Sequence, residues 1–317
     1  MTNLLTEHRL VFENMQELEE YLERIKKDFN LHLFRKVNNK LDSEIAEKIL
    51  SGGKRLRPIL LLLVFKALNG KDIEKALDVA SALELAHNAS LTHDDIIDVD
   101  FERRGKPTLW RQIGIGRALI EGHRLINLAF QIALSEGLDI ARIFLTAWDR
   151  SSNGVLKELM NRSLPGKTLY LRIIKEKTAS LFEAAAECGA LIAGAPPKVI
   201  QEAKKYGERV GIAYQLADDY VDIIKGRFSV RSHLIFYNRF EEKIRQIMLA
   251  IKLKRTPHLG TILEPKIDWK KFLIEEMARS IREAKEIIEY LDLAEPEKTY
   301  LKKFPEYCVY SMLSELS

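Results

Sequence analysis

The sequence predicts an all-α protein, organised as one large helical bundle. Apolar residues recur at helical spacing through most of the 317 residues, whereas the alternating pattern typical of strands is almost absent. Hydrophobic residues make up 46% of the chain and charged residues 30%, which excludes a disordered chain and suffices for a large core. Glycine and proline fall mainly between the helical stretches, where they mark turns.

The expected helices can be followed along the chain by their apolar stripes, which we interpret as core-facing sides. The clearest stripes consist of Phe12, Met15, Leu18, Leu22 and Ile25, then Ile73, Leu77, Ala80 and Leu83, and finally Leu273, Met277, Ile281, Ile288 and Leu291. Breaks that contain Gly or Pro occur at 51–58, 69–70, 103–107, 163–167, 195–197 and 254–268. None of them has the composition of a flexible linker, so we expect a single domain over residues 1–317.

Charge and cysteine content exclude several classes of protein. The net charge is only +4, and no dense basic tract with interleaved aromatics occurs, which argues against nucleic-acid binding. Cys188 and Cys308 are too few for a disulfide framework and fit a reducing cytoplasm, where each is expected to be a small buried hydrophobe. Residues 1–16 lack the apolar core of a signal peptide, and the longest apolar run, 58–65, is too short to cross a bilayer. We therefore expect a cytoplasmic protein without a stable membrane anchor.

Two matched acidic clusters carry the strongest chemical signal in the chain. They consist of Asp94, Asp95 and Asp98, and of Asp218, Asp219 and Asp222. In each cluster the first and last carboxylates are four residues apart and lie on one face of a helix. Carboxylates without histidine or cysteine favour Mg²⁺ and a phosphorylated substrate, because Mg²⁺ usually keeps waters and substrate phosphates among its ligands. Alternatively each cluster is an exposed helix end, but the second copy and the destabilising like charges weigh against this.

Basic residues near the first acidic cluster predict a pocket for a diphosphate. In 52–58 two glycines allow a tight bend, and three cations lead into an apolar helix with proline in its first turn. Arg103 and Arg104 follow the acidic cluster. Arginine binds phosphate through two parallel contacts and lysine acts as a point charge, so this mixture suits a diphosphate. Alternatively, the basic residues of 52–58 and the pair Arg103 and Arg104 are ordinary exposed basic loops. This is less favoured because together they flank the acidic cluster on both sides.

The chain resembles the trans-type polyprenyl (isoprenyl) diphosphate synthases, most of all those that make geranylgeranyl or longer-chain products. Four motifs carry the resemblance in order and at approximately the family's spacing: GGKRLRP, HNASLTHDDIIDVDFERRGKPT, IIKEKTASLF and GIAYQLADDYVDI. The resemblance covers about residues 45–225. It implies a large helical bundle, usually a homodimer, in which the two acidic clusters face each other across a deep central cavity.

The resemblance also implies roles for individual residues. Mg²⁺ would be held by Asp94, Asp95, Asp98 and Asp218, with Asp219 and Asp222 as further catalytic acids and additional candidates for holding the ion. The diphosphate of an allylic substrate would lie against Arg103, Lys177, Thr178 and Gln215, and isopentenyl diphosphate against Lys54, Arg57, His87 and Arg104. Neutralising the leaving diphosphate lowers the cost of breaking the carbon–oxygen bond, and the double bond of isopentenyl diphosphate then attacks the allylic carbocation.

Two of these residues have ordinary structural alternatives. His87 lies on a largely apolar helix, where a lone histidine is more often part of the core than a ligand. It stands two turns before Asp94 on the same stripe, which favours a place in the site. Lys177 could be an exposed charge between other charged residues, and its match to the third motif favours a function.

Product length is expected to depend on the residues below the first acidic cluster, because the growing chain is apolar. Ala89 and Ser90 stand about one turn before Asp94, and Ala86 stands another turn down. Their small size favours an open channel and a product of about twenty carbons or longer. A bulky exchange such as Ala89→Phe should then shorten the product.

The chain departs from the family pattern at several points. Residues 223–238 lack the usual glycine- and lysine-bearing loop, and Lys225 or Arg227 would have to supply its charge. His123 stands where aspartate is usual, Val155 replaces an acid or amide, and the basic C-terminal end is absent. These departures leave open a weakly active or non-catalytic partner subunit of a heteromeric synthase. A cyclase on the same fold is less favoured, because it needs no pocket for a second diphosphate.

Overall fold

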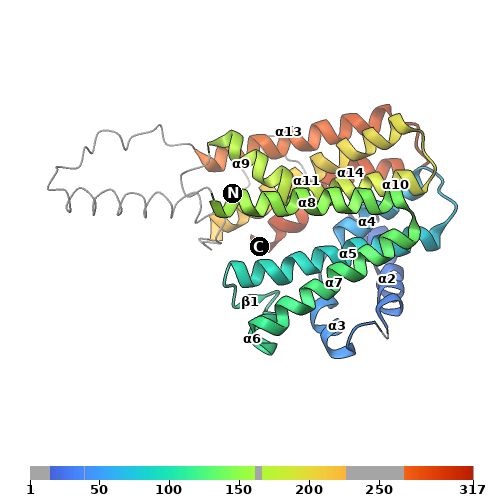
Figure 1. The fold of residues 1–317 in the computed structure, drawn as a ribbon. Coiled ribbons are helices and arrows are strands. Elements are labelled where there is room, and N and C mark those ends of the chain that lie inside the picture. The colour runs from blue at the N-terminus through green and yellow to red at the C-terminus, as the bar shows by residue number, and fades with distance from the viewer. Residues whose placement is uncertain (1–14, 39, 161–165, 226–267, 317) are drawn as a thin grey trace, which may run out of the picture.

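The structure is a computed structural model that describes residues 15–38, 40–160, 166–225 and 268–316. The described chain is almost entirely helical (Figure 1), which confirms the all-α prediction. The main helices are α2 (Gln16–Val37), α3 (Ser43–Leu50), α4 (Leu56–Ala67), α5 (Ile73–Ile97), α6 (Leu109–Ile113), α7 (Ile115–Glu136), α8 (Leu138–Met160), α9 (Lys167–Ile174), α10 (Ser180–Ile192), α11 (Pro197–Lys225), α13 (Trp269–Tyr290) and α14 (Glu297–Leu313).

Two short strands and two short helical turns complete the described fold. Strands β1 (Glu102–Arg103) and β2 (Lys106–Pro107) form an antiparallel hairpin directly after α5. A single π-helical turn, η1 (Lys175–Ala179), joins α9 to α10, and a 3₁₀ turn, η3 (Ser314–Leu316), follows α14. Periodicity of apolar residues does not distinguish a π turn from the α-helix around it, so η1 could not be predicted from the apolar pattern.

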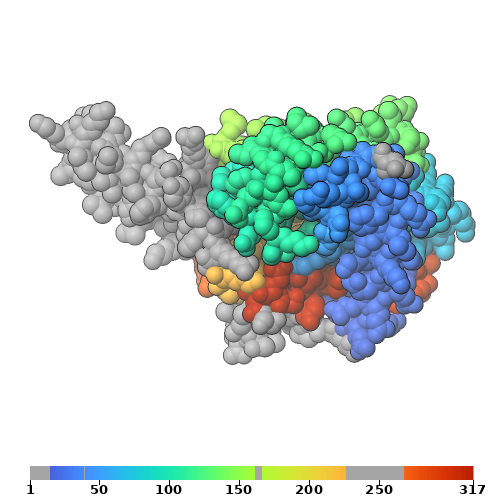
Figure 2. Space-filling view, turned by 90° about the horizontal axis from the view of Figure 1, so that it is seen from below, coloured from blue at the N-terminus to red at the C-terminus, as the bar shows by residue number. Residues whose placement is uncertain are grey.

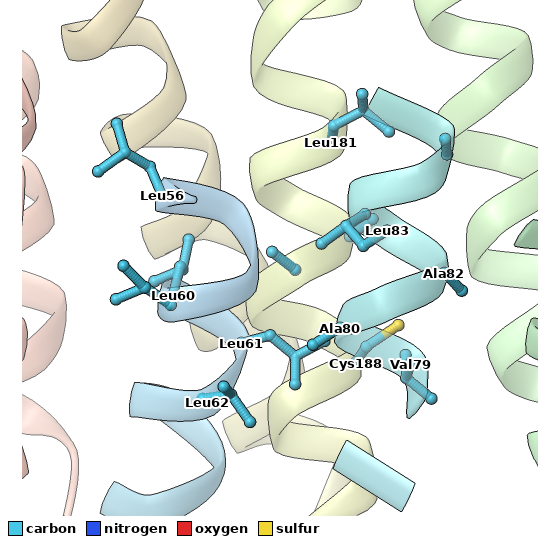
Figure 3. Packing of buried hydrophobic residues seen from close by; sticks show 14 of the residues in the cluster. Leu56, Leu60, Leu61, Leu62, Val79, Ala80, Ala82, Leu83, Leu181 and Cys188 are labelled. Atoms are coloured by element: carbon cyan, nitrogen blue, oxygen red, sulfur yellow. The ribbon is translucent and has the colours of Figure 1, made fainter. Parts of the chain in front are cut away.

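The core lies where α4, α5 and α10 meet. Figure 3 shows Leu61 of α4 pointing toward Ala80 of α5 and Cys188 of α10. Helices α4 and α10 approach closely at Gly189, where an added Cβ would lie 2.5 Å from the carbonyl oxygen of Leu61. Cys188 and Cys308 are both buried and free, as expected for small hydrophobes. Small side chains on α5 and α10 therefore let α4, α5 and α10 pack tightly against one another.

Most of the predicted stripes face this core or a second one formed by α11, α13 and α14. The buried members are Met15, Leu18, Leu22, Ile25, Ala80, Leu83, Leu273, Met277, Ile281 and Ile288. Ile73 is 40% exposed at the first turn of α5, whereas Phe12 lies outside the described residues, as does most of 1–16. In the described ranges no helix combines the length and the apolar character needed to cross a membrane.

The helices near the two ends of the described chain lie side by side, as the blue and red segments in Figure 2 show. The hydroxyl of Tyr21 on α2 donates to Glu297 on α14 at 2.5 Å, and that of Tyr300 donates to Glu17 at 2.9 Å. Helix α14 also packs against α4 and α11. This arrangement brings the C-terminal end of α14 to the loop before α4.

Candidate active site

A cavity of about 630 Å³ lies between the loop before α4, helices α5, α8 and α11, and the turn η1. Residues predicted from widely separated motifs line it together. They are Asp94, Asp98, Asp218, Asp222, Lys54, Arg57, His87, Ser90, Arg103, Arg104, Lys177, Thr178 and Gln215. The structure thus places acids and cations from all four motifs around one space.

The first and last acids of each cluster line the cavity, whereas Asp95 and Asp219 are not part of the lining described. Successive residues of a helix are turned by about 100°, so the middle acid points away from its neighbour. Asp95 contacts the guanidinium of Arg103, and burial raises the pKa of the Asp95 carboxyl although that arginine opposes the shift. Asp219 accepts hydrogen bonds from Tyr170 and Gln215. The role of these two acids as direct metal ligands stays a prediction.

The carboxylates of the cavity fit Mg²⁺ as it is usually bound in phosphate sites. Among the described residues, no three His, Cys, Asp or Glu side chains form a ready-made metal cage. Mg²⁺ is typically held by one or two carboxylates, with waters and substrate phosphates as the other ligands. Two pairs of carboxylates in a polar cavity match this donor set, so Asp94, Asp98, Asp218 and Asp222 could hold the ion against a bound diphosphate.

The loop before α4 is shaped by glycines and by a buried ion pair. Gly53 has φ +89°, a backbone conformation that favours glycine, and the guanidinium of Arg104 lies 2.9 Å from where a Cβ would stand. Arg55 pairs with Glu84 at 2.5 Å, and both side chains are 2% exposed. Arg55 also donates to Asn30 at 2.9 Å. Arg55 therefore anchors the loop to α2 and α5.

The hairpin after the first acidic cluster directs two arginines to different places. Its turn residues Arg104 and Gly105 both have positive φ, as a tight two-residue connection requires. Arg103 contacts Asp95, while Arg104 reaches back to the carbonyl of Ser51 at 3.4 Å. The hairpin thus links the first acidic cluster to the loop before α4.

The turn η1 presents Lys177 and Thr178 to the cavity and is held by α8. Lys177 is 8% exposed, and its ammonium contacts the carboxylate of Glu158. Its carbonyl accepts a hydrogen bond from the hydroxyl of Ser151 at 3.0 Å. An added Cβ at Gly154 would lie 2.5 Å from the backbone nitrogen of Lys177, so this glycine permits the close approach. Neither Glu158 nor Ser151 is predicted from the sequence, because an isolated acid or serine on a helix carries no distinctive signal.

Lys54 contacts the end of α14 and the turn η3 that follows it. This contact was not predicted from the sequence. Its ammonium donates to the carbonyl of Ser311 at 2.5 Å and to Glu315 at 3.1 Å. Glu315 also lies 3.7 Å from the ammonium of Lys225, the last residue of α11. Glu315 therefore lines the cavity beside Lys54 and lies between this lysine and Lys225.

The remaining predicted positions are placed as follows. Ser90 lines the cavity, whereas Ala86 and Ala89 are buried in the core and are not among its described lining residues. Val155 lines the cavity beside the η1 turn. The exposed ring of His123 lies 5.2 Å from that of His93, and Arg227 falls outside the described residues.

Comparisons with known proteins agree on one family. The family model described as Polyprenyl synthetase matches residues 39–230. The octaprenyl diphosphate synthase of Escherichia coli is 33% identical over 215 residues, 66% of each chain. The short chain isoprenyl diphosphate synthase of Methanocaldococcus jannaschii is 30% identical over 281 residues, 87% of this chain and 82% of that protein. The solved geranylgeranyl pyrophosphate synthetase of Pyrococcus horikoshii superposes with a TM-score of 0.71 at 28% identity, over 93% of this chain and 99% of its own.

Proposed function

The chain belongs to the polyprenyl synthetase family, and on that premise we propose that it is a Mg²⁺-dependent prenyltransferase. It would condense isopentenyl diphosphate with an allylic diphosphate, head to tail, to an all-trans product. One observation carries this proposal: two pairs of carboxylates and two sets of cations line a single cavity. Two diphosphates and the ions between them need this combination of charges in one space.

The proposed allylic site lies between the two acidic clusters. Mg²⁺ bound there would neutralise the leaving diphosphate, as a Lewis acid does at a developing negative charge. Lys177 and Arg103 would add positive charge at the same diphosphate, and Gln215 and Thr178 would fix its orientation by hydrogen bonds. These groups lie in a cavity that is partly closed to water, where each charge acts more strongly than it would in solvent.

The proposed site for isopentenyl diphosphate lies beside the loop before α4. Arg57, Arg104 and Lys54 line this part of the cavity with His87. When the allylic carbon–oxygen bond breaks, its electron pair leaves with the diphosphate. The double bond of isopentenyl diphosphate then forms the new carbon–carbon bond, and the released diphosphate accepts the proton that restores a double bond. No side chain needs to act as a nucleophile in this sequence of steps.

Product length, assembly and location belong to the same proposal. Ser90 is a small lining residue below Asp94, which supports a product of about twenty carbons or longer. The names of the relatives range from short chain isoprenyl to octaprenyl diphosphate synthase, so related chains are named for both short and long products. Exposed apolar side chains on α7 and α8, among them Ile120 and Leu145, support a homodimer formed through this face. We also propose a single domain and a cytoplasmic location, in line with the two unpaired cysteines.

A product assay on the purified chain tests the proposal. The chain is incubated with Mg²⁺, isopentenyl diphosphate and one of the five-, ten- or fifteen-carbon allylic diphosphates, and the products are read by mass spectrometry. We expect elongation that stops at one defined length and that EDTA abolishes. Metal-dependent binding of the diphosphates without any product would contradict an active synthase and favour a partner subunit in a heteromeric enzyme.

A further inference from the structure

Asp218 and Asp219 are adjacent in the second acidic cluster but have different surroundings. Asp218 lines the cavity, whereas Asp219 is 7% exposed and turned toward α9. One carboxylate oxygen of Asp219 accepts a hydrogen bond from the hydroxyl of Tyr170 at 2.5 Å. The other accepts from the amide nitrogen of Gln215 at 2.9 Å. A buried carboxylate is costly without such donors, so both bonds matter to its position.

The hydrogen bonds continue from Asp219 to the cavity through Gln215. The amide nitrogen of Gln215 also donates to Asp218 at 3.1 Å, and its oxygen accepts from the hydroxyl of Thr178 at 2.7 Å. Since both acids accept from the nitrogen and the threonine donates to the oxygen, only one orientation of the amide satisfies all three partners. Asp219 therefore helps to set the orientation of Gln215.

Tyr170 is itself held firmly by the second core. Its ring meets Trp269 edge-on at 5.4 Å between centroids and Phe272 at 6.1 Å. The tyrosine is 6% exposed, so its hydroxyl is fixed beside Asp219. Helix α13, which supplies both aromatic partners, is thereby connected to Asp219 through the hydroxyl group of Tyr170.

We propose that Tyr170 is a positioning residue for the second acidic cluster. Its hydroxyl holds Asp219, Asp219 orients Gln215, and Gln215 in turn sets the positions of Asp218 and Thr178 at the cavity. The inference rests on the proposed function, because it assigns Asp218 and Thr178 to the binding of Mg²⁺ and the allylic diphosphate. It also gives Asp219 an indirect role in place of direct contact with the ion. Loss of such an outer hydrogen bond typically weakens metal binding about 10- to 100-fold.

The exchange Tyr170→Phe removes the hydroxyl and keeps the ring packing. Tyr206→Phe is the matched control, because Tyr206 is also buried and donates to the backbone oxygen of Leu301 at 2.6 Å, away from the cavity lining. For Tyr170→Phe we expect Mg²⁺-dependent binding of an allylic diphosphate, measured by calorimetry without isopentenyl diphosphate, to weaken about 10-fold or more. The KM for isopentenyl diphosphate should stay unchanged. The control Tyr206→Phe should lose stability, but its binding of the allylic diphosphate and its KM for isopentenyl diphosphate should both stay unchanged.

A double-mutant cycle with Asp219→Asn extends the test. If Tyr170 acts through Asp219, the two exchanges together should weaken binding no more than the stronger single exchange. Unchanged binding in Tyr170→Phe, or a loss equal to that in Tyr206→Phe, would overturn the inference. A wild-type chain that binds but forms no product would contradict the proposed function and still test Tyr170. A wild-type chain that does not bind the allylic diphosphate with Mg²⁺ would overturn both.

Discussion

The side chains of Arg57 and His87 meet in the cavity, with 3.1 Å between Nη1 of the arginine and Nε2 of the histidine. Burial and the charge of Arg57 lower the pKa of His87 well below its usual value. The imidazole is therefore neutral near pH 7 and can accept a hydrogen bond from the guanidinium. Arg57 also packs over the ring of Phe182, 4.5 Å from the ring centroid, so its charge is held in one place. In the proposed function, Arg57 carries the charge at this position and His87 orients it.

The first prediction concerns stability in acid. Because the pKa of His87 is lowered in the folded state, the unfolded chain binds the extra proton more readily, and stability falls as the pH drops below about 6.5. His87→Gln should remove this contribution, which amounts to about 1 kcal/mol at pH 5.5. Urea unfolding at pH 7.5 and 5.5 measures it, with the exposed His123 exchanged to Gln as control. Equal pH dependence in wild type and His87→Gln would contradict the assignment.

The second prediction concerns the contact between α8 and η1. Gly154→Ala places a Cβ 2.5 Å from the backbone nitrogen of Lys177, so the turn must shift. We expect a stability loss of about 1–3 kcal/mol and weaker binding of the allylic diphosphate, measured by denaturant unfolding and calorimetry. Gly116→Ala is the control, because that helical glycine has open space around it. Normal diphosphate affinity in Gly154→Ala would show that the position of η1 does not control the site.

The sequence allowed prediction of the acids that line the cavity because helix geometry alone decides their direction. A spacing of four residues puts Asp94 and Asp98 on one face, and the same holds for Asp218 and Asp222. The same geometry turns Asp95 away from Asp94 and toward Arg103. Local periodicity was therefore sufficient to predict these four acids as residues that face the cavity.

Residues that act through tertiary contacts could not be predicted in this way. Tyr170 reaches Asp219 because α9 packs on α11, and Glu158 meets Lys177 because η1 packs on α8. The contact between Lys54 and Glu315 depends on the return of α14 to the loop before α4. Neither the spacing nor the type of Tyr170, Glu158 and Glu315 distinguishes them from ordinary surface or core positions.

The third prediction concerns Glu315, which we expect to compete with substrate for Lys54. The carboxylate is partly exposed and lies 3.1 Å from the ammonium of Lys54, so removing its charge should free the lysine for a diphosphate. An exposed pair contributes up to about 1 kcal/mol, so Glu315→Gln should lower the KM for isopentenyl diphosphate by up to about fivefold. The allylic KM should not change. Glu306→Gln is the control, because Glu306 pairs with Lys285 at 2.6 Å and does not line the cavity.

Steady-state kinetics at low and moderate salt distinguish this competition from a general effect of charge. Added salt weakens contacts between exposed charges, so the advantage of Glu315→Gln over wild type should shrink as the salt concentration rises. An equal gain in Glu306→Gln would indicate a change in the overall electrostatic field of the protein. An unchanged KM in Glu315→Gln would mean that Lys54 does not need to be released.

The last prediction distinguishes Ser90 from its neighbour Ala89 on α5, because both were predicted from the sequence to affect product length. Ser90 lines the cavity, so a phenyl ring at this position would fill the space below Asp94 and should shorten the product. Ala89 is fully buried outside the described lining, so Ala89→Phe should instead overpack the core and cost about 1–3 kcal/mol of stability. Mass spectrometry of the products and urea unfolding of both variants provide the comparison. Shorter products from Ala89→Phe with full stability, and none from Ser90→Phe, would place the growing chain on the other face of α5.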